Sequence, residues 1–193
     1  MSEHPPTLGD KPVPALTQAT VLKVLSELAE ALDSDHCQGE LCLFGASVMM
    51  LAFEARAAAK DVEAIFYPTQ KIRELAGKIG ELNRLPKGWL NEGVKGSLST
   101  RHRVIEGNLP QFSNLRLMMP IPEYLLAMSC LAWRGESAAG DAGEAQDIVF
   151  LIRHLSLKSP TQVMEMVTAY YQPERVPALA RHLVESLFTE GKI

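Results

Sequence analysis

The segment Leu41–Phe66 constrains the fold of this chain more than any other, and it reads LCLFGASVMMLAFEARAAAKDVEAIF. A short apolar run ends at Gly45, a helical pattern follows over 47–56, and a second apolar run carries Asp61 and Glu63. Short apolar runs bounded by glycine and proline are typical of buried strands. We therefore expect two neighbouring strands of one sheet, joined by a helix that begins after the glycine turn.

Helical patterns surround this unit and dominate the second half of the chain. Apolar residues recur at helical spacing over 15–32 and 69–83, and 114–119 is a third strand candidate. From residue 122 on, only helices are expected, over 123–134, 145–155, 159–171 and 175–188. The sequence thus predicts an α+β fold, a small sheet flanked by helices with a C-terminal helical bundle. The expected units are a flexible leader at 1–14, an α/β core at 15–120 and a helical subdomain at 121–193 that packs on the core.

The composition is that of a globular protein that needs no disulfide or metal to hold its core. Hydrophobic residues make up 47% of the chain and charged residues 22%. The three cysteines form no CxxC pair, so a cytoplasmic location is expected. The N-terminus lacks the apolar region of a signal peptide, and no apolar stretch is long enough to span a bilayer, so no membrane partner is expected. The net charge of −4 argues against indiscriminate nucleic-acid binding but allows a local basic patch.

Asp61 and Glu63 are the residues with the clearest chemistry. Residues i and i+2 of a strand point to the same face, so both carboxylates are expected on one side of the second strand. Two carboxylates on one face suit a divalent ion that prefers oxygen ligands, such as Mg²⁺. The turn at Gly45 lets the backbone approach a ligand, and the N–H groups of the next helix and the Ser47 hydroxyl are expected to bind a phosphate. A metal beside a phosphate site is the equipment of phosphoryl-type transfer.

This arrangement resembles the nucleotidyltransferase superfamily, in which a strand, a Gly-Gly or Gly-Ser turn, a helix and a strand bearing Asp-x-Asp follow one another. Gly45-Ala46-Ser47 and Asp61-Val62-Glu63 stand at those places. The similarity is greatest to the minimal bacterial branch that includes AbiEii-type toxins, whose pattern R-x-x-T-K-D-I-D is partly matched by Arg56–Glu63. The similarity spans about residues 41–188 and continues in Trp89-Leu90-Asn91, Pro122–Met128, Asp147-Ile148 and Phe150–Leu155.

The resemblance implies a mixed sheet of nucleotidyltransferase type and Mg²⁺-dependent transfer of a nucleoside monophosphate from a nucleoside triphosphate to an acceptor hydroxyl. The acceptor would be a tRNA end, a protein or a small molecule. Membership of a toxin–antitoxin or phage-defence pair, with a cognate partner protein, is a further implication. The implied catalytic residues are Asp61, Glu63 and Asp147, of which Asp61 and Glu63 would bind the metal. The implied nucleotide-binding residues are Gly45, Ala46, Ser47, Arg56, Lys60 and Ser129.

Four departures from the family pattern predict weak activity. Glu63 replaces the second Asp, and its longer side chain would loosen the metal geometry. Ser129 replaces a Lys that is expected to meet the nucleotide phosphates, and Arg56 and Lys60 are the nearest cations that would take its place. Ala59 replaces a Thr, and Ala46 supplies no hydroxyl in the turn.

Other interpretations of the same residues stay open. Asp61 and Glu63 also suit a solvated edge strand, and Gly45 suits an ordinary turn. An acid such as Asp147 near the start of a helix is favoured by the helix dipole. The basic cluster over 101–103 is either a contact for RNA or nucleotide phosphate, or a solvated loop. The alternative to a weak enzyme is a non-catalytic module of the same fold that binds a nucleotide, an RNA or a protein.

Overall fold

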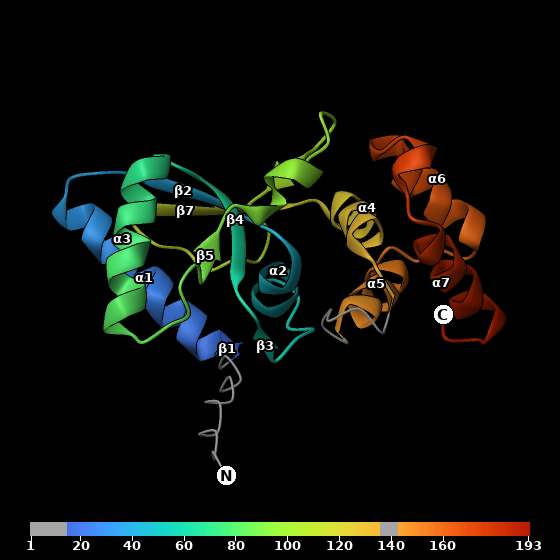
Figure 1. The fold of residues 1–193 in the computed structure, drawn as a ribbon, viewed down its shortest axis with the longest axis horizontal. Helices are drawn as coiled ribbons and strands as arrows, with labels where there is room; N and C mark the ends of the chain where they lie inside the picture. The colour runs from blue at the N-terminus through green and yellow to red at the C-terminus, as the bar shows by residue number, and fades with distance from the viewer. Residues whose placement is uncertain (1–14, 136–142) are drawn as a thin grey trace, which may run out of the picture.

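The computed structural model describes residues 15–135 and 143–193, which form an α+β fold with a helical C-terminal half (Figure 1). The strands are β1 Leu16–Thr17, β2 Gly39–Leu43, β3 Ala58–Ala59, β4 Val62–Tyr67, β5 Leu90–Asn91, β6 Val104–Ile105 and β7 Leu115–Pro120. The helices are α1 Gln18–Ser34, α2 Gly45–Leu51, α3 Thr69–Leu82, α4 Pro122–Ala132, α5 Gly143–His154, α6 Pro160–Tyr170 and α7 Ala178–Thr189, with 3-10 helices η1 Gly93–Ser97 and η2 Pro173–Arg175. The leader expected at 1–14 lies outside the described residues.

A mixed sheet in the order β5-β4-β2-β7-β6 forms the centre of the core. β2 pairs antiparallel with β4, with Leu41 opposite Phe66, and it pairs parallel with β7. The expected neighbours, 41–44 and 61–66, are therefore adjacent in one sheet, and Val62 and Phe66 are buried as predicted. β1 and β3 form a separate two-stranded pair.

Helices α1 and α3 cover one face of this sheet (Figure 1). Gly39 of β2 faces both helices, because a Cβ at this position would lie 2.6 Å from Leu32 Cδ1 and 3.4 Å from Ile72 Cδ1. Alternate strand residues share a face, so Leu41 and Leu43 point toward the same helices, and both are fully buried. The main apolar core of the first half therefore lies between β2, β4, α1 and α3.

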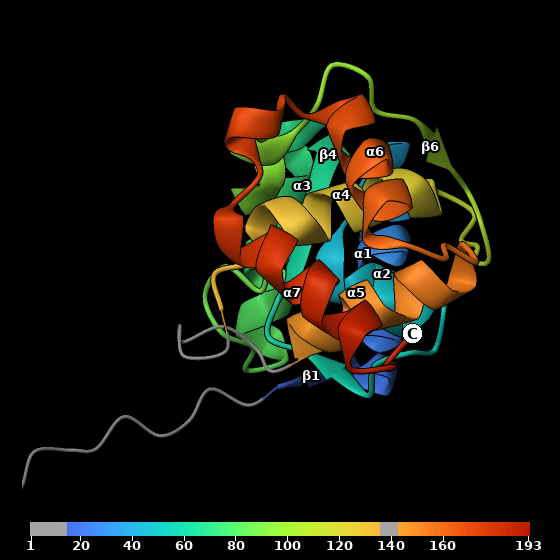
Figure 2. The same cartoon turned by 90° about the vertical axis from the view of Figure 1, so that its right-hand side faces the viewer.

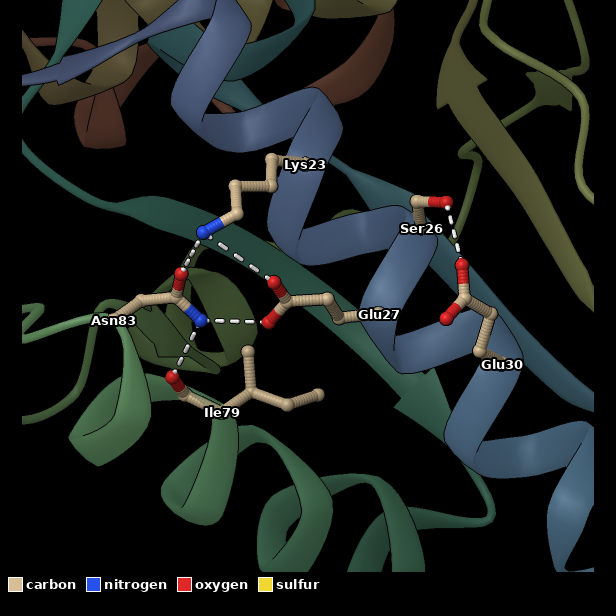
Figure 3. Close-up of polar contacts among 6 residues, drawn as sticks. All are labelled: Lys23, Ser26, Glu27, Glu30, Ile79 and Asn83. Atoms are coloured by element: carbon tan, nitrogen blue, oxygen red, sulfur yellow. Dashed lines mark hydrogen bonds and ion pairs between the residues drawn. The ribbon is translucent and has the colours of Figure 1, made fainter.

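Polar contacts fasten α1 to the C-terminal end of α3 (Figure 3). The Asn83 amide donates to Glu27 Oε2 at 2.6 Å and to the Ile79 carbonyl at 3.0 Å, and its oxygen accepts from Lys23 Nζ at 2.6 Å. Lys23 also pairs with Glu27 at 3.5 Å, one turn along α1. Because Lys23 is largely exposed, the packed apolar face beneath these contacts contributes more to stability than the ion pair does.

The C-terminal helices pack at the edge of the sheet where β2 and β7 end (Figures 1 and 2). β7 leads directly into α4, whose first residue is Pro122, a position that tolerates proline because its N–H would lack a helical partner. Since β2 and β7 are parallel and β4 runs the opposite way, the carboxyl ends of β2 and β7 lie beside the amino end of β4. α2 follows β2 at this edge and contacts α4 and α5.

Residues 97–103, which we call the strap, tie the core to the helical bundle. The hydroxyl of Tyr124 on α4 is fully buried and accepts a hydrogen bond from the Ser99 backbone N–H at 2.8 Å. The hydroxyl of Tyr171 donates to the Ser97 carbonyl at 2.7 Å. The strap is therefore held in place by side chains of the C-terminal half.

Two differences from the expected elements have local causes. The helix expected over 47–56 ends at Leu51, and Glu54 soon after it adopts a left-handed φ of 52°, which an α-helix does not continue through. The strands β1, β3, β5 and β6 are each two residues long, too short for an alternating pattern to predict.

Replacing Tyr124 by Phe is expected to lower the free energy of unfolding by about 1–3 kcal/mol, because the Ser99 N–H stays buried without its acceptor. Urea unfolding measures this change. Tyr67→Phe is the matched control, since it removes the same atom from a residue that is 71% exposed. The control should stay within about 0.5 kcal/mol of wild type. Equal effects of the two substitutions would contradict a stabilising role for this strap hydrogen bond.

Candidate functional site

A cavity of about 320 Å³ lies at the edge where the ends of β2 and β7 meet the start of β4. Its walls come from both halves of the chain, namely the start of α2, the approach to β4, η1, α4 and the start of α5. Residues far apart in sequence converge there because three strand ends and two C-terminal helices share this edge. The expected site residues that line the cavity are Gly45, Ala46, Arg56, Lys60, Asp61, Glu63, Ser129 and Asp147.

Ser47 does not line the cavity. Its hydroxyl donates to the Phe44 carbonyl at 2.8 Å, and the residue is 1% exposed. It therefore stabilises the turn into α2, and the geometry does not support the expected phosphate contact. α2 itself has only seven residues, so few peptide dipoles align at its N-terminus. Among the residues that the structure describes, Arg56 and Lys60 are the cations that line the cavity.

Asp61 and Glu63 both face the cavity from the amino end of β4. Asp61 precedes the strand and Glu63 is its second residue, so the spacing of two places their side chains on one face. Burial raises the pKa of Glu63 above its usual value, and the nearby charges of Asp61 and Glu144 raise it further. A cation bound between these carboxylates would favour the ionised form and reverse this shift.

Two glycines lie beside the Glu63 carboxylate. A Cβ at Gly45, which has a φ of +56°, would lie 3.3 Å from Glu63 Oε2, and a Cβ at Gly93 would lie 3.3 Å from Oε1. The Asn91 side chain accepts from the Gly93 N–H at 2.9 Å and fixes this second approach. A side chain at either position would crowd the carboxylate, so the missing Cβ atoms of the two glycines leave room for it.

Asp147 and Arg56, 91 positions apart in sequence, form a two-point ion pair at the cavity wall. Arg56 Nε donates to Asp147 Oδ1 at 2.8 Å, and Nη2 lies 2.8 Å from Oδ2. The two side chains are only 9% and 8% exposed. Gly143 lies against the guanidinium, since a Cβ there would be 2.5 Å from Arg56 Cζ. In this geometry Asp147 positions Arg56, and the catalytic role implied for Asp147 stays a prediction.

Other residues of the cavity were not predicted from the sequence. Glu144, at the start of α5, lines it and raises the pKa of Glu63. Val94, Leu125 and Met128 form a buried apolar wall. No local pattern marks these residues, because they reach the cavity only when η1, α4 and α5 fold onto the sheet edge.

The donors at this site suit Mg²⁺ as part of a complex with phosphate. Asp61 and Glu63 supply oxygen ligands, and Mg²⁺ in proteins is usually held by one or two carboxylates together with waters and substrate phosphates. Among residues 15–135 and 143–193, no group of three or more His, Cys, Asp or Glu is arranged to hold a metal ion. A metal here would therefore need water or phosphate oxygens to complete its coordination.

The chain matches no protein-family model, no curated protein and no solved structure. The resemblance to nucleotidyltransferases therefore depends on the residues and their placement at the cavity. Within the part of the chain that the structure describes, no helix combines the length and the apolar character that a membrane crossing requires.

Replacing Asp147 by Leu is expected to lower the free energy of unfolding by about 3–5 kcal/mol, because it breaks a buried two-point ion pair. Adding Arg56→Met removes the other half of the pair and should recover part of the loss. Urea unfolding of wild type, both single variants and the double variant measures the coupling between the two residues. A double variant that loses the full sum of the two single effects would show that the pair is not coupled.

Glu63→Gln is expected to raise the melting temperature at neutral pH in the absence of metal. Because the folded-state pKa of Glu63 lies above the usual value of 4.5, wild type loses stability as the pH rises from that value through the folded-state pKa. The Gln variant lacks this loss of stability. The melting temperatures of the two proteins should therefore converge in acid and differ increasingly toward pH 7. Glu165→Gln, at an exposed position of α6, is the control and should not separate from wild type. A Gln variant less stable than wild type at neutral pH would contradict this expectation.

Proposed function

We propose that the cavity binds a nucleoside triphosphate with Mg²⁺ and that the chain is a nucleotidyltransferase-like protein with slow nucleotidyl transfer. One observation carries this proposal: Asp61 and Glu63 share a cavity with the glycine turn of α2 and the cations Arg56 and Lys60. The order of strand, glycine turn, helix and antiparallel strand is the arrangement by which the chain resembles nucleotidyltransferases. A sheet of nucleotidyltransferase type is part of the same proposal.

In the proposed complex, Asp61 and Glu63 hold the metal, and Lys60 and Arg56 contact phosphate oxygens. Bound Mg²⁺ supplies positive charge that offsets the charge building up on the reacting phosphate. In the transfer step the acceptor oxygen bonds to the α-phosphorus, the bond to the diphosphate breaks, and a carboxylate takes the acceptor proton. Ser129 lines the same cavity and offers a hydroxyl in place of a charge.

The charge of the cavity predicts that nucleotide binding requires the metal. The described lining residues include four carboxylates, Asp61, Glu63, Glu144 and Asp147, and two cations, Arg56 and Lys60. A triphosphate alone would add negative charge to a wall that already carries an excess of it, and like charges in a partly buried site repel strongly. A divalent ion removes this repulsion, so the metal and the nucleotide should bind together.

Two features support slow transfer. Ser129 brings no positive charge to the phosphates, and the loss of one preorganised electrostatic contact typically costs about 10²–10³ in rate. The Arg56 charge is balanced by Asp147, so less of it is left to stabilise the transition state. This second feature also favours the other candidate, a nucleotide-binding module without turnover.

The acceptor and the location complete the proposal. The acceptor hydroxyl belongs to an RNA, a protein or a small molecule, and the exposed basic surface over residues 101–103 favours nucleic acid.

We also place the protein in the cytoplasm, which the free thiols of Cys37, Cys42 and Cys130 support, since a reducing compartment keeps thiols unpaired.

Calorimetric titration with each nucleoside triphosphate, with and without Mg²⁺, tests the binding step. We expect binding only with Mg²⁺, and loss of that binding in Asp61→Asn, which keeps the shape of the side chain but removes its charge. Glu185→Gln, at an exposed position of α7, is the control and should bind as wild type does. Metal-independent binding that persists in Asp61→Asn would show that the nucleotide binds elsewhere.

Incorporation of labelled nucleotide into cell RNA and cell protein tests the transfer step. Glu63→Asp combined with Ser129→Lys should raise transfer by about 10²-fold or more, because it restores one electrostatic contact. Asp61→Asn should abolish any transfer. If the restored variant binds Mg²⁺ and nucleotide but transfers nothing, the non-catalytic module is the correct candidate.

A further inference from the structure

The segment from η1 through the strap carries basic residues that do not line the cavity. Between Glu92 and Glu106 the chain contains Lys95, Arg101, His102 and Arg103 and no acidic residue. Residues 100–105 are all exposed. This local run stands out on a chain whose net charge is −4.

A third exposed arginine reaches this surface from a distant part of the sequence. Arg175 lies over the ring of Tyr171, with 5.4 Å from Cζ to the ring centroid, and Tyr171 in turn bonds to the first residue of the strap. Arg101 Nη1 donates to the Ala169 carbonyl at 3.1 Å, which fixes its guanidinium beside the end of α6. We define the basic patch as Arg101, Arg103 and Arg175.

Aromatic and apolar side chains lie among these arginines. Tyr170 is half-buried, its ring centroid is 5.0 Å from that of Tyr124, and its hydroxyl is close enough to Arg103 to interact with its charge. Val104 and Ile105 of the edge strand β6 are 40% and 41% exposed. Cations interleaved with such groups suit a single-stranded nucleic acid, whose phosphates meet the cations while its bases stack on aromatic and apolar surface. An acidic protein segment would bind through the cations alone, so the aromatic and apolar groups among them favour a nucleic acid as the partner.

Nearby acids reduce the positive charge of this surface without cancelling it. Glu92 is shared by Arg73 and Lys95, at 2.5 Å from each, so these three residues together keep a positive surplus. Glu123 interacts with the Tyr170 hydroxyl, and Glu174 precedes Arg175 in η2. The cations named for this surface, which are Arg73, Lys95, Arg101, Arg103 and Arg175, still outnumber the three acids Glu92, Glu123 and Glu174.

We propose that the basic patch binds a single-stranded nucleic acid through its phosphodiester backbone. The strap begins at Ser97, and Ser97 and Val94 of η1 line the cavity. A strand bound along the strap therefore lies next to the cavity, where its terminal hydroxyl would be the acceptor. The role as acceptor rests on the proposed function, whereas the binding itself does not.

Fluorescence anisotropy with labelled single-stranded RNA and DNA of one sequence, in EDTA and at several salt concentrations, tests this proposal. Three phosphate contacts predict a slope of log affinity against log salt of about −2. Arg101→Gln with Arg103→Gln should reduce the slope by about 1.4 and weaken binding about 25-fold at about 0.1 M salt, since each contact contributes about 0.7 log units per tenfold change in salt. Equal binding of RNA and DNA supports recognition of the backbone alone, and tighter binding of RNA supports the same patch with added contacts to the 2′-hydroxyls.

Three matched variants separate charge from folding. Arg101→Lys with Arg103→Lys keeps the charge and should keep most of the affinity and the slope. Lys78→Gln with Lys158→Gln removes the same charge from α3 and from the loop before α6, at exposed positions, and should change neither. Arg175→Gln removes a charge of the patch from outside the strap, and it should reduce the slope by about 0.7.

Asp61→Asn distinguishes this proposal from the proposed function. It should bind the strand as wild type does even though it loses the metal–nucleotide complex, and loss of strand binding in this variant would place the strand in the cavity and overturn the proposal. Unchanged affinity and slope in the Arg101→Gln, Arg103→Gln variant would also overturn it. An equal loss of affinity in the Lys78→Gln, Lys158→Gln variant would overturn it as well. Binding of a polyglutamate peptide with the same affinity as RNA would also overturn it.

Discussion

Repulsion among carboxylates is the constraint on which the rest of this structure depends. Asp61, Glu63, Glu144 and Asp147 line one cavity, and without compensation their charges would drive them toward solvent. Arg56 balances one of them through a buried two-point ion pair. Glu63 lies beside two glycines that leave room for its carboxylate, and burial and the charges of Asp61 and Glu144 raise its pKa. Buried carboxylates that repel one another are typical of a ligand-binding site, and we propose a cation with a phosphate as that ligand.

The helical half of the chain completes the site as well as covering it. α4 and α5 deliver Ser129 and Asp147 to a cavity whose other wall is the edge of the sheet. The strap hydrogen bonds and the Arg56–Asp147 pair both join the two halves of the chain. The basic patch lies at the same boundary, so the surface that we propose for nucleic acid and the cavity that we propose for nucleotide are built by the same contacts.

The local part of the site was predicted from the pattern of residues itself, whereas Ser129 and Asp147, which also line the cavity, were expected there only from the resemblance. Two apolar runs and a glycine predict adjacent strands, and a spacing of two on a strand predicts that Asp61 and Glu63 share a face. Ser47 illustrates the limit, because a hydroxyl after a glycine turn looks the same in sequence whether it contacts a phosphate or the backbone of its own turn. The Arg56–Asp147 pair was beyond prediction as a contact, since its partners are 91 positions apart and only the packing of α5 brings them together. Glu144 and the wall of η1 escaped prediction for the same reason.

Crystals grown with Mn²⁺ and a non-hydrolysable nucleoside triphosphate would test the central claim most directly, because anomalous scattering locates the ion. We predict one ion bound to carboxylate oxygens of both Asp61 and Glu63 at about 2.1 Å, a distance typical of the Mg²⁺ that it replaces. The ion should also bind phosphate oxygens, with the triphosphate inside the cavity. An ion bound to other residues, or a nucleotide bound outside the cavity, would contradict the function proposed here.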